Sequence, residues 1–234
     1  MSKLKQILTT LVPALLLTLN FPAYATWSII AVDRDTGEIG IGGASCTFDV
    51  SGVASLVPGK GAIVVQAASH YFARMDGVKH MSEDQSAASI LSAMKASKYE
   101  PEKQQYGVIL LKKGTQPVVY SGSEIKGWKG EKLDHDVAVL GNILVNEDVI
   151  DNAFSAYQQN KAAPFAQRMI RALKAGADAG GDSRCGAQAA RSAFVMLYNQ
   201  QTQAITKLSV FGTEANGSPA VTLLERKFAL LHGD

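Results

Sequence analysis

Short apolar runs separated by turn-forming residues dominate the chain, and they predict a fold rich in β-strands. Residues 27–32 are apolar except at Ser28, as expected of a strand that is covered on both faces. Turn-forming residues at 33–38 lead into a returning strand at 39–46, which indicates a hairpin. Trp128 falls in a Gly- and Ser-rich loop. Further apolar runs predict strands at 62–67, 106–111, 117–120, 135–140, 192–198 and 204–210.

Helical spacing of apolar residues occurs in three places. Ser82 and Gln85 are spaced as a capping box for a helix that ends before Pro101. Its apolar face carries Ala87, Ile90, Leu91 and Met94. Two later patterns, at 147–159 and 164–179, also predict helices.

The order of these elements is strands, helix, strands, two helices and strands. Strands this apolar need cover on both sides, so we expect an α+β fold in which two stacked antiparallel sheets are flanked by helices. A simpler layered α+β arrangement is compatible with the same order.

Residues 1–25 have the three parts of a signal peptide. Two early lysines precede an apolar run at 7–21, and small residues follow at Ala23 and Ala25. The alternative is an uncleaved membrane anchor, but polar residues and a proline interrupt the run, which is shorter than the roughly 20 residues that a span needs. We therefore expect a cut by signal peptidase after Ala25.

That cut leaves one domain at 26–234, with residues 212–234 as a peripheral cap. The 23 Lys and Arg include two in the predicted signal, which leaves 21 against 21 Asp and Glu. A balanced surface exerts no long-range attraction on nucleic acid or on anionic lipid. We expect a periplasmic or secreted protein with neither partner and no membrane attachment after cleavage. Self-assembly into a homo-oligomer is left open.

The predicted cut makes Thr26 the first residue of the exported chain. A threonine there carries a hydroxyl nucleophile and an α-amine on one residue, and this pair performs acyl transfer without histidine. An α-amine has an ordinary pKa of about 7.7–8.0, so part of it is neutral and accepts a proton near neutral pH. The alternative is that Thr26 is merely the residue that follows a cleavage site.

Other chemistries lack their motifs. The glycines at 40, 42 and 43 do not complete a dinucleotide fingerprint, because its third glycine falls at Ser45. Ser92 and Lys95 have the S-x-x-K spacing of penicillin-recognising enzymes without the companion motifs. No zinc pattern is present, so we expect neither metal nor cofactor.

Several short segments in order along the chain resemble one bacterial family, called domain of unknown function 1028. They include Ser-Ile-Ile-Ala-Val-Asp behind Thr26 and Trp27, Gly-Ala-Ser-Cys at 43–46, Gln-Tyr-Gly-Val at 105–108 and Gly-Asn-Ile-Leu at 141–144. That family is placed in the N-terminal nucleophile (Ntn) hydrolase superfamily. The resemblance implies a four-layer αββα sandwich whose first residue attacks an amide or related acyl carbon, but it implies no substrate.

The resemblance also bears on the two cysteines. On composition alone, Cys46 and Cys185 form either a disulfide in an oxidising compartment or two buried thiols. The chain is similar to secreted relatives that share the Ala-Ser-Cys and Arg-Cys segments, which implies a disulfide between them. Residues 182–186 depart from the pattern of many other members.

Five further residues are candidates for the site around Thr26. Asn142 is expected to help hold the oxyanion, Asp182 to orient the amine, and Arg184 to bind a substrate carboxylate. A turn and a loop ion pair are the structural alternatives. Two other candidates for substrate binding, at strand ends that should converge on the site, are Ser45 and Gln66.

We therefore expect an exported N-terminal-threonine amidohydrolase that cleaves an amide-type C–N bond in a small or peptide-like substrate and becomes active when the signal is removed. The alternative is a non-catalytic ligand-binding module on the same scaffold.

Overall fold

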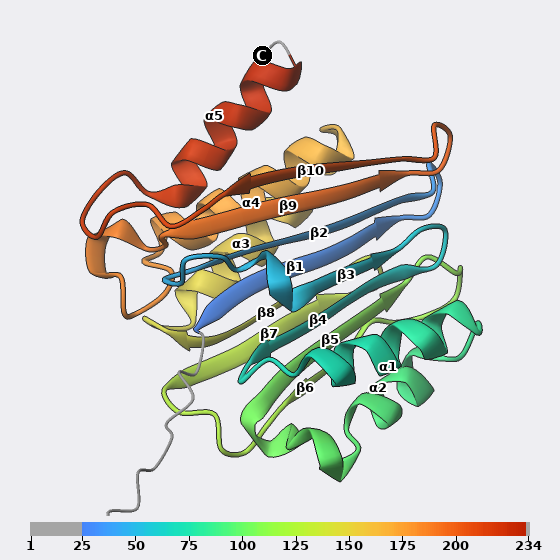
Figure 1. Ribbon diagram of the computed structural model, residues 1–234. Coiled ribbons are helices and arrows are strands. Elements are labelled where there is room, and N and C mark those ends of the chain that lie inside the picture. Colours follow the sequence, from blue (N-terminus) through green and yellow to red (C-terminus); the bar gives the residue numbers. More distant parts are fainter. Residues whose placement is uncertain (1–24, 233–234) are drawn as a thin grey trace, which may run out of the picture.

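The computed structural model describes residues 25–232, and these form a mixed α+β fold with two antiparallel sheets and five α-helices (Figure 1). The predicted signal segment before Ala25 lies outside the described residues. No helix in the described part is both long and apolar enough to cross a membrane.

The larger sheet has six strands in the order β10–β9–β2–β1–β8–β7, with β1 (Thr26–Asp33) at its centre. β1 pairs with β2 (Glu38–Ser45) on one side and with β8 (Val137–Leu144) on the other. The remaining strands are β7 (Trp128–Asp134), β9 (Ser192–Asn199) and β10 (Ala204–Val210).

The smaller sheet has four strands in the order β3–β4–β5–β6. These are β3 (Ala54–Val57), β4 (Gly61–Ala67), β5 (Gln104–Leu110) and β6 (Val118–Ser121). Helices α1 (Tyr71–Ser82) and α2 (Ala87–Met94) pack on this sheet.

The other three helices pack on the larger sheet. α3 (Asp148–Gln159) and α4 (Phe165–Asp178) contact β8, β1 and β2. α5 (Ala220–His232) lies against β9, β10 and α4 (Figure 1), and it buries Val221, Leu224 and Phe228.

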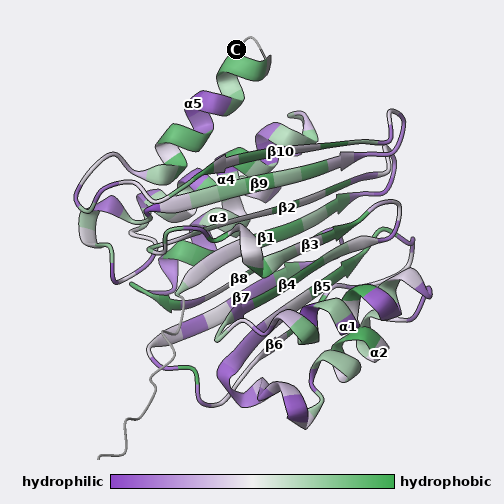
Figure 2. Ribbon diagram, in the orientation of Figure 1, coloured by the Kyte–Doolittle hydropathy of each residue, from purple (hydrophilic) through white to green (hydrophobic). Residues whose placement is uncertain are grey.

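Three apolar clusters hold these parts together, because successive side chains of a strand point to opposite faces. Trp27 and Ile29 of β1 point toward α3 and α4, whereas Ile30 and Val32 point toward the smaller sheet. The third cluster joins the smaller sheet to α1 and α2 and includes Ile63, Val65, Tyr106, Ile90 and Met94. Figure 2 accordingly shows hydrophobic colouring along the central strands and hydrophilic colouring at the turns.

Glycines in β2 allow α4 to approach the sheet closely. A Cβ on Gly40 would lie 2.8 Å from the ring of Phe165, and one on Gly42 would lie 2.8 Å from Leu173. The close approach that these glycines indicate is therefore made by helix side chains.

Most predicted elements are confirmed, including the β1–β2 hairpin, the β5–β6 hairpin, α3 and α4. Three predictions were wrong. Ser82 ends α1 and donates back to the carbonyl of Val78, while Ser86 caps α2. Trp128 begins a strand, because β7 pairs along β8 despite its polar composition. The strand predicted at 135–140 is β8, which continues past Leu140 to Leu144.

Candidate active site

Polar side chains gather at one end of the space between the two sheets. β1 begins there at Thr26, which pairs with Asn142 of β8. Four other strands place polar residues at the same end, where β2 ends and β9 begins, and where β4 and β5 pair. These residues are Ser45, Ser192, Gln66 and Gln105. The sequence predicted that Ser45 and Gln66 converge on Thr26, and the strand pairing brings them to this end.

Thr26 itself is fully buried at the start of the central strand. Its carbonyl accepts a hydrogen bond from Gln66 Nε2 at 3.3 Å. It lines a pocket of about 230 Å³, whose other walls are Thr47, Asp49, Val50, Gly52, Val53 and Ser69. A threonine at the end of a pocket is placed where a ligand could meet its side chain.

The peptide bond before Thr26 is bound by two donors. Ser45 Oγ donates to the carbonyl oxygen of Ala25 at 2.5 Å, and Arg184 Nη2 donates to the same oxygen at 3.2 Å. Ala25 is as buried as Thr26. A hydroxyl and a guanidinium that converge on one carbonyl form an arrangement able to stabilise negative charge on oxygen.

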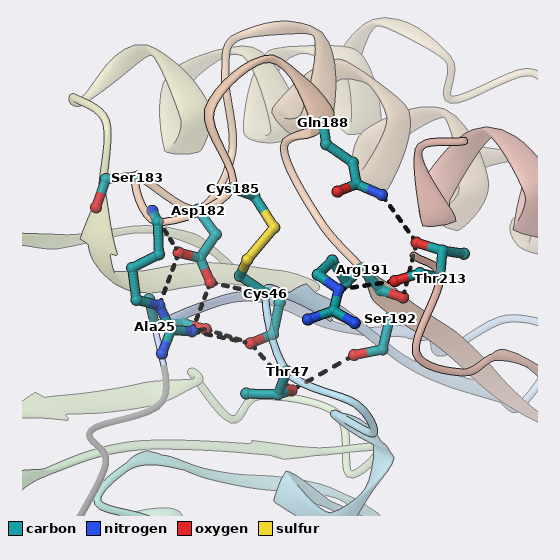
Figure 3. Close-up of a disulfide and its surroundings, with 12 residues drawn as sticks. Ala25, Cys46, Thr47, Asp182, Ser183, Cys185, Gln188, Arg191, Ser192 and Thr213 are labelled. Atoms are coloured by element: carbon teal, nitrogen blue, oxygen red, sulfur yellow. Dashed lines mark hydrogen bonds and ion pairs between the residues drawn. A yellow bond between two sulfur atoms is a disulfide. The ribbon is translucent and has the colours of Figure 1, made fainter. Parts of the chain in front are cut away.

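Asp182 fixes the position of that guanidinium. Its carboxylate is fully buried and accepts from Arg184 Nε at 3.0 Å, from Arg184 Nη2 at 2.7 Å and from the backbone N–H of Cys46 at 2.7 Å (Figure 3). The predicted pair of Asp182 and Arg184 is thus an ion pair at the site. Asp182 contacts the end of β2, and Arg184 contacts Ala25.

A disulfide attaches this loop to the sheet. Cys46 and Cys185 are bonded, with their Cα atoms 5.6 Å apart, which confirms the predicted bridge (Figure 3). Because Cys46 follows the last residue of β2 and Cys185 follows Arg184, the bridge holds the ion pair beside the start of β1.

Behind Thr26, four polar side chains form a buried hydrogen-bonded network. Ser28 Oγ donates to Gln66 Oε1 at 2.7 Å, and Gln66 Nε2 donates to Gln105 Oε1 at 2.7 Å. Asn142 Nδ2 donates to the same Gln105 oxygen at 3.2 Å. Gln105 is oriented by its own Nε2, which donates to the carbonyl of Gly141 at 3.0 Å.

This network determines what Asn142 can offer. Its Nδ2 is engaged with Gln105, whereas its Oδ1 is buried without a hydrogen-bond partner. Asn142 therefore presents an unpaired acceptor in the network. The predicted donor role toward an oxyanion stays a prediction, and it would use the second N–H of the Asn142 amide.

The backbone is strained at three points of the same end. Ala67, Ile143 and Ala189 have φ values of 66°, 53° and 61°. A β-branched residue in the left-handed region is unusual, and such residues gather at functional sites. Ile143 directly follows Asn142, and its carbonyl accepts from Ser183 Oγ at 2.7 Å.

Sequence reasoning missed Ser28, Gln105 and Ser192 as members of this end. The sequence held a signal for two of them, because Ser28 and Gln105 lie at even spacing from Ile30 and Ile109, and so on the strand face that meets the opposite sheet. Within residues 25–232, no group of three or more His, Cys, Asp or Glu side chains is placed to hold a metal ion.

Comparison with known proteins points to one family. A family model described as a family of unknown function, DUF1028, matches residues 26–217. The crystal structure of a protein from Silicibacter pomeroyi, which carries the same family label, has a similar fold. The TM-score is 0.74 at 20% identity, and the match covers 88% of each chain. No curated protein matches the chain.

Proposed function

The chain belongs to the DUF1028 family, whose members are grouped without a known function, and from the site itself we propose that it is an exported N-terminal-threonine amidohydrolase. The observation that carries this proposal is the position of Thr26. It begins the central strand, lines a pocket, and follows a carbonyl held by Ser45 and Arg184.

The boundaries of the family match agree with this proposal. The match begins at Thr26, the residue that the predicted cut would make the first of the exported chain. The disulfide supports export as well, because disulfides persist in oxidising compartments such as the periplasm or the extracellular space.

The order of the layers supports the superfamily assignment. Helices α1 and α2, the smaller sheet, the larger sheet, and helices α3 and α4 contact one another in that sequence. This is the order of the αββα sandwich that the resemblance implies, and we propose that the fold is of the Ntn-hydrolase type.

In the proposed reaction, the α-amine of Thr26 accepts the proton of its own hydroxyl, and Oγ1 attacks the carbonyl carbon of the substrate amide. When the tetrahedral intermediate collapses, the C–N bond breaks and the departing nitrogen takes the proton from the ammonium. Water, deprotonated by the same amine, then attacks the ester and releases the acid. Thr26 regains its hydroxyl proton, so the enzyme returns unchanged.

Two donors are placed to assist this chemistry. Ser45 Oγ and Arg184 Nη2 bind the Ala25 carbonyl in the precursor. Once that residue has been removed, they would donate to a carbonyl or carboxylate oxygen of the substrate instead. Asp182 positions the guanidinium, and the unpaired Asn142 Oδ1 would accept a hydrogen bond from the ammonium or from a substrate N–H.

The test compares four forms of the protein on a panel of amides, cyclic imides and short peptides. They are the exported wild type, a precursor that retains residues 1–25, Thr26→Ala and Thr26→Ser. We expect hydrolysis by the wild type and by Thr26→Ser, which keeps both hydroxyl and amine. We expect none by the precursor, whose Thr26 nitrogen is an amide, or by Thr26→Ala.

Hydrolysis by a folded Thr26→Ala variant would show that another group is the nucleophile. Binding of a panel compound by both wild type and Thr26→Ala, with turnover by neither, would identify a non-catalytic ligand-binding module instead.

A further inference from the structure

Exposed aromatic side chains occur in segments next to the pocket beside Thr26. In residues 25–232, the large aromatic side chains that are more than half exposed are Phe48 (72%), Tyr71 (57%), Phe72 (66%) and Phe211 (52%). We refer to these four as the aromatic rim. The other exposed large hydrophobic side chains of the described residues are aliphatic, namely Leu133, Val145, Ile205, Leu230 and Leu231.

Two segments bring the rim to the pocket. Phe48 lies between Thr47 and Asp49, which both line the pocket. Tyr71 and Phe72 begin α1, two residues after Ser69, which also lines it.

Further contacts hold the two segments in place. Arg74 lies over the ring of Tyr71 at 5.4 Å and donates to the carbonyl of Ala54 at 2.8 Å, beside the pocket residue Val53. The Gly212 N–H donates to the carbonyl of Phe48 at 2.8 Å, and the Phe48 ring lies against Gly212, the residue after Phe211.

The pocket is too small to hold a whole ligand of ordinary size. Its volume of about 230 Å³ lies below the roughly 300–1,000 Å³ of sites that enclose drug-sized molecules. With Ala25 in place the pocket accommodates only a small group, so a longer substrate of the exported form would extend beyond it toward the rim. Exposed aromatic side chains next to a pocket mark a surface that binds apolar groups.

We propose that the substrate is a peptide-like chain that carries an aromatic or large apolar side chain close to the scissile amide, and that Phe48 and Tyr71 determine this specificity. The inference rests on the proposed function for the cleavage step, but the binding preference stands without it. The sequence left small and peptide-like substrates open, and this inference selects the peptide-like class.

The first experiment measures hydrolysis of matched acetyl-tripeptide coumarylamides in which one residue at a time is Phe, Ala or Asp. We expect the best Phe peptide to exceed its Ala counterpart at least tenfold in kcat/KM. Phe48→Ala and Tyr71→Ala should remove most of that difference through KM, and Phe48→Leu should restore part of it. Ile205→Ala is the matched control, because Ile205 is half exposed at the opposite end of the sheet.

The second experiment does not depend on turnover. Calorimetry measures binding of unlabelled acetyl-tripeptide amides to the exported Thr26→Ala protein, with and without Phe48→Ala. The inference is supported if Phe peptides bind more tightly than Ala peptides and if this difference disappears in the Phe48→Ala variant. That result would stand even if the wild type hydrolyses nothing and the proposed function fails.

Three outcomes would overturn the inference. The first two are equal binding of Phe and Ala peptides, and discrimination that survives both rim substitutions. The third is self-association in sedimentation velocity that the rim substitutions abolish, because the rim would then be a subunit interface.

Discussion

The two ends of the space between the sheets are built differently from the same strands. At the end near the β1–β2 turn, the facing side chains are apolar, among them Val32, Ala62, Ile109 and Ala138. At the Thr26 end, the same strands place Ser28, Gln66, Gln105 and Asn142 at the equivalent alternating positions. Each strand thus changes from apolar to polar along its length.

The difference indicates that the polar end is kept for a reason other than stability. Replacing a buried polar network by apolar groups of similar shape is often neutral or stabilising, whereas breaking it in part is costly. The polar end also holds the pocket, the strained residues and the disulfide. We infer that the apolar end supplies most of the stability and that the polar end supplies the function.

The disulfide is where the polar end should contribute most to stability. The bridge spans 139 residues of sequence, and on the chain-entropy model such a loop contributes on the order of 4–5 kcal/mol. Replacing Cys46 and Cys185 together by Ala should lower the melting temperature by about 2–4 °C per kcal/mol lost. Calorimetry without reductant measures this, and an unchanged Tm would contradict it.

A cavity at the apolar end should cost at most about as much as loss of the bridge, and it should leave the chemistry intact. Ile30→Ala removes a fully buried side chain between the sheets and should destabilise the fold by about 2–5 kcal/mol. Urea unfolding measures the loss, and kcat per folded molecule should be unchanged. A variant that folds fully but loses turnover would show that the two ends are not separable in this way.

Breaking the polar network should cost less again. Gln66→Leu removes the acceptor of Ser28 Oγ and a donor to Gln105, so we expect a loss of about 1–3 kcal/mol together with lower activity. Adding Ser28→Ala removes the unpaired hydroxyl and should recover part of the stability but not the activity. A Gln66→Leu protein as stable and as active as the wild type would show that the network supports neither stability nor activity.

The smallest predicted effect is a dependence on pH. The α-amine of Thr26 must be neutral to accept a proton, so kcat/KM should rise with pH and level off above the amine pKa. The ordinary pKa of an α-amine, about 7.7–8.0, is the reference for that midpoint. Below the midpoint the rate should change about tenfold per pH unit. A rate that falls as pH rises through 6 to 8 would contradict this assignment.

Much of the fold could be predicted from the sequence, because it depends on patterns within single elements. Runs such as 27–32 and 204–210 identify their own strands, and helix periodicity locates α3 and α4. The strand β7 was missed because its polar residues follow no apolar alternation, and only pairing with β8 makes it a strand.

The candidate site was predictable in part. Thr26, the cysteine pair and the ion pair of Asp182 with Arg184 carry recognisable chemistry in the sequence. The network was not predictable as such, because Ser28, Gln66 and Gln105 become neighbours only when two sheets stack. The donors on the Ala25 carbonyl likewise come from segments 20 and 159 residues away in sequence.

The central claim is that export makes Thr26 the first residue and its hydroxyl the nucleophile. The most direct measurement treats the exported protein with a β-lactone, whose ring opens to form an ester with an active hydroxyl, and maps the product by mass spectrometry. The account predicts an N-terminal peptide that begins at Thr26 and carries one added acyl group on that residue. A chain that begins elsewhere, or an acyl group only on another side chain, would contradict it.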